Sequence, residues 1–333
     1  MRRLSSLFLP QPPQIPQKKL FSSPPNAPSK KTKMSSSAAA LRLRRRHKKV
    51  VVIMGPTGCG KSKLSIDLAA GFFPAAEIIN SDKIQVYRGL DITTNKIPPP
   101  ERKNVRHHLL GEFGGGDFTP ADFRSAASAA ISQIWSRRKL PMVVGGSNSF
   151  IYALMAKRFN PEIDVFADGE YSGGGGGGGA AFCKEVRYNC CFIWIDVFPP
   201  VLNDYLSRRV DDMLESGMAA ELSEYFRSPE KLWRRKCGLN KAIGVAEFRR
   251  RFIGGWEERE AVGAIKENTC QLAKRQMGKI VRLREEAGWE LKRVDATASF
   301  RARMESGGGV AAEIWEREVV QPSVKIVKNF LME

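Results

Sequence analysis

The sequence predicts an α/β fold: a parallel sheet flanked by helices, with a smaller helical domain that closes over the binding site. Three observations lead to this fold class. A glycine-rich loop at residues 55–62 joins a β-branched run to an amphipathic stretch. Apolar strands then alternate with helices up to about residue 200, which is typical of a doubly wound parallel sheet. From about residue 201 the spacing of apolar residues is helical only.

The glycine-rich loop is a complete phosphate-binding motif. It follows a predicted strand at 49–54 and precedes a predicted helix at 63–70, and this order confirms the motif. Inward-pointing N–H groups and the helix N-terminus favour anions. Lys61 supplies a charge for the outer phosphates, and Ser62 can hold Mg²⁺. We therefore expect a P-loop NTPase-like core that binds a di- or triphosphate ester. The predicted binding residues are Gly55, Pro56, Thr57, Gly58, Cys59, Gly60, Lys61 and Ser62.

Further strands and a helix extend this core. A helix is predicted over 119–137, with Thr119 as its N-cap and Pro120 at its first position. Ligands of open parallel sheets bind at the carboxyl ends of the strands, so the polar residues that follow each strand are candidates for the site. The other predicted strands are 77–80, 140–144 and 191–196.

The chain is predicted to divide into four parts. Residues 1–47 form a disordered basic segment, 48–200 the P-loop core, 201–300 a helical region whose last long helix returns to the core, and 301–333 a C-terminal tail, loosely structured from about residue 305. The predicted helices of the third part are 202–216, 218–226, 240–252 and 257–286.

Low-complexity sequence interrupts the predicted core once. The run Gly173–Gly179 cannot gain order from side-chain burial, so we expect a flexible insertion there.

The charge of the chain is concentrated at one end. The net charge is +19, but the first 50 residues hold 13 of the 54 Lys and Arg and none of the 35 Asp and Glu, which leaves the remainder at +6. A mildly basic body argues against a wide RNA-binding face. No run of 18 apolar residues occurs, so we expect no transmembrane helix. The six cysteines lack paired spacing, which favours a reducing compartment without a disulfide framework.

Residues 1–47 resemble a targeting segment in composition. They are rich in Ser, Pro, Arg and Lys, contain no acid, and lack the apolar core of a secretory signal. We predict a transit peptide, for the chloroplast or plastid more than for the mitochondrion. The alternative is a basic tail of a cytoplasmic or nuclear protein, because residues 42–49 would also pass for a nuclear signal.

Asp82 is the strongest candidate for an acid–base residue. It follows the second strand, about 20 residues after Lys61, on the same rim as the phosphate-binding loop. A carboxylate there can accept a proton from an attacking group, although a cap or turn role would also suit it. Asp196 ends a strand in the manner of a Walker B aspartate, which would suit a kinase, but any parallel strand can end in Asp.

Other polar clusters have a simpler interpretation. Residues 211–215 imitate the aspartate-rich motif of helical isoprenoid synthases, but only one such cluster is present, which favours a solvated helix face. His107 and His108 have no partner at metal-binding spacing, so we expect structural histidines. The cations of 273–279 form either a solvated face or a lid over a substrate phosphate.

Taken together, these motifs resemble the adenylate/tRNA isopentenyltransferase family, which prenylates adenine. The resemblance spans about residues 48–300 in the right order and is highly specific. The segments that carry it are 55–62, 80–96, 107–111, 145–151, 209–214, 241–245 and 264–276.

The resemblance implies a reaction and roles for its residues. The loop would hold the diphosphate of dimethylallyl diphosphate with Mg²⁺, and the N6 amine of AMP, ADP or ATP would attack its C1. Asp82 would accept the amine proton, and Thr57 and Arg209 would stabilise the departing oxygen, although Arg208 is adjacent. Lys274 and Arg275 would close over the diphosphate from the helical side.

Departures from the family pattern bear on the acceptor. The chain has Ser147 and Phe150 where the tRNA-modifying branch typically has Thr and Tyr, and we find no Cys/His finger near its end. We therefore predict an adenylate dimethylallyltransferase that begins cytokinin synthesis, with tRNA an unlikely partner, no membrane association and a monomeric state. The alternatives are a tRNA dimethylallyltransferase, a P-loop small-molecule kinase, and a non-enzymatic nucleotide switch, which lacks a base-specificity motif.

Overall fold

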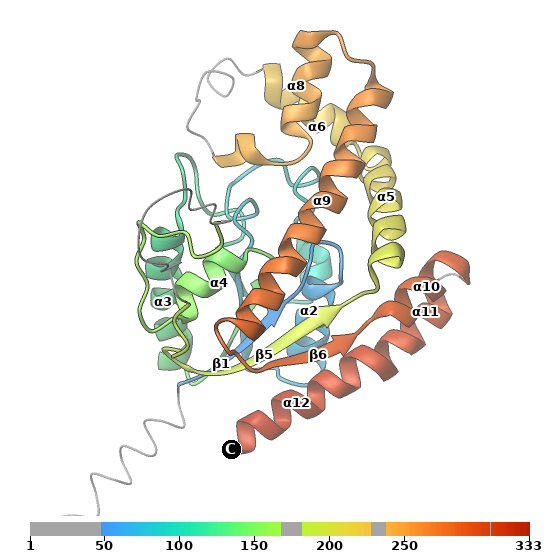
Figure 1. Ribbon diagram of the computed structural model, residues 1–333. Coiled ribbons are helices and arrows are strands. Elements are labelled where there is room, and N and C mark those ends of the chain that lie inside the picture. Colours follow the sequence, from blue (N-terminus) through green and yellow to red (C-terminus); the bar gives the residue numbers. More distant parts are fainter. Residues whose placement is uncertain (1–47, 168–181, 228–237, 307) are drawn as a thin grey trace, which may run out of the picture. The chain divides into compact units, whose positions relative to one another are not determined.

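The computed structural model describes residues 48–167, 182–227, 238–306 and 308–333 (Figure 1). Every described residue belongs to one compact unit of the chain. The predicted transit segment at 1–47 and the run Gly173–Gly179 lie outside the described residues.

A six-stranded sheet forms the centre of the fold. Its order is β3-β2-β4-β1-β5-β6, and all neighbouring strands run parallel, which confirms the predicted fold class. The strands are β1 (Lys49–Met54), β2 (Ala76–Asn80), β3 (His107–His108), β4 (Leu140–Gly145), β5 (Asn189–Asp196) and β6 (Leu291–Asp295).

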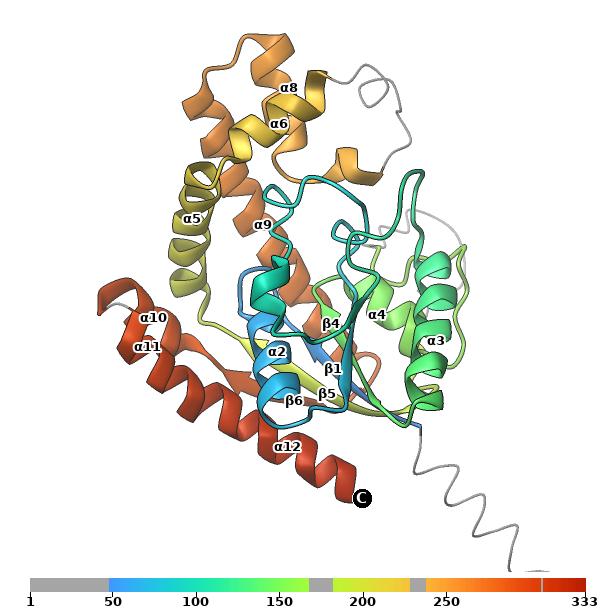
Figure 2. The ribbon, with the colours of Figure 1, turned by 180° about the vertical axis from the view of Figure 1, so that it is seen from behind.

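Both faces of the sheet are covered by helices, because alternate residues of each strand point to opposite sides. On β1, Val50, Val52 and Met54 join one hydrophobic cluster, whereas Val51 and Ile53 join the other. Figures 1 and 2 show the two helical layers. One is formed by α3 (Pro120–Ser136), α4 (Asn148–Met155) and α9 (Glu258–Glu285), and the other by α2 (Lys61–Gly71), α10 (Thr297–Glu305), α11 (Gly308–Trp315) and α12 (Gln321–Met332).

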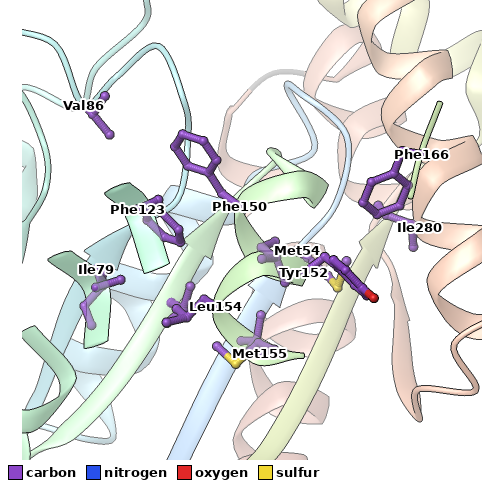
Figure 3. Close-up of a cluster of buried hydrophobic side chains, with 14 of the residues drawn as sticks. Met54, Ile79, Val86, Phe123, Phe150, Tyr152, Leu154, Met155, Phe166 and Ile280 are labelled. Carbon is purple, nitrogen blue, oxygen red and sulfur yellow. The ribbon is translucent and has the colours of Figure 1, made fainter. Parts of the chain in front are cut away.

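The first cluster is rich in aromatic side chains (Figure 3). Phe123 of α3 stacks on Phe150 of α4, with ring centroids 4.6 Å apart. Tyr152 of α4 stacks on Trp289, with centroids 5.9 Å apart, and its hydroxyl accepts a hydrogen bond from the Cys183 N–H. These contacts fix α4, whose N-terminus directly follows Gly145 and Gly146, so the core also positions the rim of the sheet.

Helix α3 begins where the sequence predicts. The Thr119 hydroxyl accepts from the Asp122 N–H, the Asp122 carboxylate accepts from the Thr119 N–H, and Pro120 takes the first helical position.

The helical region extends from the carboxyl side of β5. Helix α9, 28 residues long, packs against α4, α5 and α8, and Figure 1 shows it running from the α6–α8 group to the sheet. The elements that precede it are α5 (Pro199–Glu215), α6 (Met218–Arg227) and α8 (Val245–Gly254).

Two expectations about the C-terminal third are wrong. The region beyond residue 201 is not helical throughout, because β6 pairs with β5 at the edge of the sheet. Residues from 305 onward are not loosely structured: α11, a π-helical turn at Glu316–Val320 and α12 pack on the second cluster. Helix α12 buries Val324, Val327 and Phe330 at helical spacing.

Other expectations from composition agree with the described residues. The five cysteines in the described ranges are all free thiols. No helix in that part of the chain is long and apolar enough to cross a membrane.

A charged cluster stabilises the edge of the sheet near the amino end of β2, away from Asn80 at its other end. Glu77 is 1% exposed and forms ion pairs with His108, Arg137 and Lys139 at 2.7, 2.7 and 2.9 Å. Burial raises the pKa of Glu77, but the hydrogen bonds of Lys139, His108 and Arg137 outweigh it and lower that pKa to about 2. The predicted structural role of His108 is therefore confirmed.

We predict that Glu77→Gln lowers the free energy of unfolding by about 2 kcal/mol at pH 7, since Arg137 and Lys139 lose their anionic partner. The loss is smaller than for a fully buried pair because Arg137 and Lys139 are 36% and 40% exposed. The difference in free energy of unfolding between the wild type and Glu77→Gln is complete above the ordinary glutamate pKa of 4.5. It disappears as the pH falls toward the folded-state pKa of about 2.

Urea denaturation at several pH values measures this difference. The exposed Glu162 has no side-chain partner among the described residues, so Glu162→Gln serves as the control. Equal losses in the two variants would contradict the stabilising role of Glu77.

Candidate active site

Three strand ends meet at one rim of the sheet. Strand β4 lies between β1 and β2, so the phosphate-binding loop after β1 and Asp82 after β2 lie on either side of Gly145 and Gly146. A Cβ on Gly145 would overlap Ser81, and one on Gly146 would lie 3.4 Å from the Gly55 carbonyl oxygen. The two glycines therefore let the three segments approach each other closely.

The loop has the backbone curl that the motif predicts. Gly58 and Gly60 have φ of 82° and 88°, a conformation that favours glycine, and α2 begins directly after Gly60. The Lys61 ammonium donates to the Pro56 carbonyl oxygen at 2.5 Å. Cys59 is fully buried, and desolvation raises the pKa of its thiol. Ser62 is exposed in the first turn of α2.

Arg209 of α5 faces the loop, whereas its neighbour Arg208 does not. The Arg209 guanidinium donates to the Thr57 hydroxyl at 3.2 Å, and its buried Nε finds no hydrogen-bond partner among the described residues. Burial lowers the pKa of Arg209, although a guanidinium stays charged. Arg208 is exposed and donates to the Met304 carbonyl. The structure thus distinguishes two arginines that the sequence left uncertain.

Asp82 has a turn role and an unused oxygen. Its Oδ1 accepts from the N–H groups of Ile84 and Gln85 at 2.9 and 3.3 Å. Within the described ranges, no group hydrogen-bonds to Oδ2. The side chain is partly exposed, and its charge acts on Arg209. The turn interpretation and the acid–base interpretation are therefore compatible, because each uses a different carboxylate oxygen.

Gln276 and Asn148 belong to the site, although the sequence reasoning gave them no role. The Thr57 N–H donates to Gln276 Oε1 at 2.6 Å, and Asn148 Nδ2 donates to the Gln276 carbonyl at 2.9 Å. Both side chains are buried, at 8% and 2% exposure. Two features of the sequence could have indicated these residues. Gln276 is a polar residue on the apolar face of α9, and Asn148 follows the glycines after β4 as the first residue of α4.

Lys274 and Arg275 are not in contact with the loop. Both are exposed on α9, next to Gln276, and neither has a hydrogen bond or ion pair among the described residues. Their closing role over a diphosphate stays a prediction.

The two other acidic candidates, Asp196 and Asp211, each form an ion pair with a residue outside the phosphate-binding loop. Asp196 accepts from Arg293 at 2.6 Å, and Asp211 pairs with Lys266 at 2.6 Å across α5 and α9. Asp211 is 51% exposed, as expected for a solvated helix face. No group of three His, Cys, Asp or Glu that could hold a metal ion occurs in the described part of the chain.

The charged and polar groups at this rim can bind a phosphate ester and accept a proton. The backbone N–H groups of the loop, Lys61 and the partly buried Arg209 lie at one rim of the sheet, which suits a phosphate ester. A carboxylate oxygen without a hydrogen bond lies on the neighbouring strand end and can accept a proton.

Comparisons with known proteins agree on one family. A family model described as IPP transferase matches residues 85–171 and 178–280. The chain is 54% identical over 309 residues to an adenylate isopentenyltransferase of Humulus lupulus, covering 84% of this chain and 90% of that protein. It is 47% identical over 304 residues to adenylate isopentenyltransferase 6, chloroplastic, of Arabidopsis thaliana, covering 85% and 86%. A further Arabidopsis relative, 42% identical, is named mitochondrial.

Among solved structures, the tRNA isopentenylpyrophosphate transferase of Bacillus halodurans superposes with a TM-score of 0.65 at 27% identity. The match covers 86% of this chain and 97% of that one. A eukaryotic dimethylallyltransferase acting on tRNA has the same TM-score at 24% identity, with coverage of 86% and 80%, and shows the shared fold.

We predict that Gln276→Leu frees α9 from the loop. The partly buried Thr57 N–H would lose its acceptor, which costs about 1 kcal/mol. Hydrogen exchange should then be faster at the Thr57 amide than in the wild type. Gln271→Leu, at an exposed position of the same helix, is the control. Unchanged protection of Thr57 would show that Gln276 does not hold the loop.

Proposed function

Because this chain belongs to the IPP transferase family, we propose that it is an adenylate dimethylallyltransferase that begins cytokinin synthesis. It transfers the dimethylallyl group of dimethylallyl diphosphate to N6 of AMP, ADP or ATP and releases diphosphate. The observation that carries the proposal is the meeting of Asp82, Thr57 and Arg209 beside the phosphate-binding loop. The identity to named adenylate isopentenyltransferases supports it.

In this proposal the loop binds the donor. The backbone N–H groups of residues 55–62 and the Lys61 ammonium hold the diphosphate, and the allylic carbon points toward Asp82. The amine nitrogen forms a bond to C1 as the bond from C1 to the bridging oxygen breaks. The amine proton passes to Asp82 Oδ2, and the electron pair of the broken bond leaves with diphosphate.

Thr57 and Arg209 act on the leaving group. Arg209 donates to the Thr57 hydroxyl oxygen, so the hydroxyl hydrogen is available for the bridging oxygen as negative charge develops there. This partly buried cation acts more strongly than one in open water, because its surroundings hold less water.

Mg²⁺ fits the residues present. The exposed Ser62 hydroxyl has no hydrogen-bond partner among the described residues, and Mg²⁺ favours one or two protein oxygens together with substrate phosphates. We propose that Ser62 holds the ion, which neutralises diphosphate charge when bound.

The acceptor is proposed to be a free nucleotide. Named adenylate isopentenyltransferases support this choice, whereas the structural relatives that act on tRNA support the alternative of a tRNA dimethylallyltransferase. We further propose a monomer without membrane association. The chloroplastic names of several relatives support a plastid location, and a relative named mitochondrial supports that compartment as an alternative, beside the cytoplasm and the nucleus.

Product mass distinguishes these functions. The full chain is incubated with Mg²⁺, dimethylallyl diphosphate and, separately, AMP, ADP, ATP or unmodified tRNA. We expect a nucleotide to gain one dimethylallyl group. Transfer to tRNA alone would move the protein to the RNA-modifying branch. No transfer to either would contradict the proposal and favour the kinase alternative.

We predict that Asp82→Asn lowers kcat by about 10²–10⁴ with donor binding nearly unchanged. The amide oxygen can still accept from Ile84 and Gln85, so the turn is kept while the base is lost. Single-turnover kinetics and donor titration measure the two effects. Asp212→Asn, at an exposed position of α5, is the control. Lost donor binding in the Asp82 variant would count against its role as base.

We also predict that Arg209→Ala lowers kcat by about 10²–10³, because a charge beside the leaving group is removed. Arg208→Ala should stay within about twofold of the wild type, since that side chain is exposed and bonded elsewhere. Steady-state rates of both variants test the assignment, and equal losses would refute it.

A further inference from the structure

The C-terminal helices reach the phosphate-binding loop through one side chain. Trp315, the last residue of α11, is 4% exposed, and its indole ring lies directly against Gly60. A Cβ on Gly60 would lie 2.5 Å from the indole Cη2 atom. Gly60 is the N-cap of α2 and directly precedes Lys61 and Ser62, so the ring contacts the loop where it becomes a helix.

Trp315 is also fixed to the second turn of α2. Its indole N–H donates to Asp67 Oδ2 at 2.9 Å, and Lys63 bonds the same oxygen at 2.7 Å. The Lys63 ammonium lies 5.0 Å from the centroid of the indole ring. The Trp315 side chain therefore contacts both the N-cap of α2 and Asp67, about two turns further along, which restrains the helix in position and tilt.

The Trp315 ring also packs against other aromatic side chains. Phe300 of α10 packs edge-on against Trp315 with centroids 6.5 Å apart, and Tyr205 of α5 packs edge-on against Phe300 at 4.7 Å. Helix α5 also carries Arg209, which bonds Thr57. The aromatic side chains Tyr205, Phe300 and Trp315 therefore connect Gly60 to α5, the helix whose Arg209 bonds Thr57.

We propose that Trp315 is a positioning residue for the donor diphosphate. It holds Gly60 and the N-terminus of α2, so that the N–H groups of the loop and the Lys61 ammonium point at the phosphates. This inference rests on the proposed function in naming the donor as dimethylallyl diphosphate. It assigns to the C-terminal helices a role in donor affinity in addition to their role in stability.

The test compares the full-length wild type with Trp315→Leu, Trp315→Phe and Phe330→Leu. Phe330 of α12 belongs to the same hydrophobic cluster and is 7% exposed, but its carbonyl and its ring contact Lys49 and not the loop. It therefore reports general loosening of the C-terminal helices. Calorimetry measures the Kd of inorganic pyrophosphate with Mg²⁺, thermal unfolding measures Tm, and steady-state kinetics measures KM for donor and nucleotide separately.

We expect Trp315→Leu to raise the pyrophosphate Kd and the donor KM about tenfold, because a small shift of positioned groups is costly. The nucleotide KM should change less than about twofold. Trp315→Phe keeps a ring beside Gly60 but lacks the N–H for Asp67, so it should fall between Leu and the wild type. Phe330→Leu should lower Tm without raising either constant.

Several results would overturn the inference. These are a pyrophosphate Kd in Trp315→Leu within about twofold of the wild type, an equal rise in Phe330→Leu, and a wild type that does not bind pyrophosphate. If Trp315→Leu does not fold, the comparison of Trp315→Phe with Phe330→Leu decides: a higher Kd in the former supports the inference, and equal values overturn it.

The proposed function is tested separately. A wild type that binds pyrophosphate but transfers no dimethylallyl group would contradict that function, while the Kd values would still decide the role of Trp315.

Discussion

A hydrogen bond from the Thr57 N–H to Gln276 Oε1 joins the phosphate-binding loop to α9, the longest helix in the described part of the chain. The same glutamine lies against Gly146, and its carbonyl accepts from Asn148. The loop after β1, the loop after β4 and the middle of α9 therefore meet at one residue. Because α9 also packs against α5 and α8, this contact connects the helical region to the rim of the sheet.

A loop that presents its N–H groups to an anion has few of them left for its own structure, so neighbouring side chains must hold it. Here they do so from three sides. Gln276 contacts Thr57 from α9, Arg209 contacts it from α5, and Trp315 covers Gly60 from the C-terminal helices. The small size of the glycines is what allows each of these groups to approach the backbone.

Charge is treated differently at the two ends of the sheet. Glu77, away from the loop, is held by Arg137, Lys139 and the His108 ring, and these contacts lower its pKa. At the loop, the buried Nε of Arg209 has no partner among the described residues, and Asp82 keeps an oxygen without a hydrogen bond. A charged group such as Glu77, whose partners are all in the protein, contributes to the fold. Arg209 and Asp82 each keep a hydrogen-bonding atom without a partner among the described residues, and these atoms are available for a substrate.

The sequence by itself determined the elements whose signal is local. The loop at 55–62, the strands around it and the capped start of α3 follow from glycine conformation, β-branched runs and the pairing of Thr119 with Asp122, all of which act within a few residues.

Tertiary structure alone decided what depends on distant partners. The β6 strand is short and half polar, and it gains its hydrogen bonds only from β5. Gln276 and Trp315 acquire their roles because folding brings them to Thr57 and Gly60, more than 200 residues away, and no local pattern encodes such a contact. Whether Arg208 or Arg209 contacts the loop likewise depends on how α5 is oriented in the fold, which places Arg209 beside Thr57 and Arg208 beside Met304.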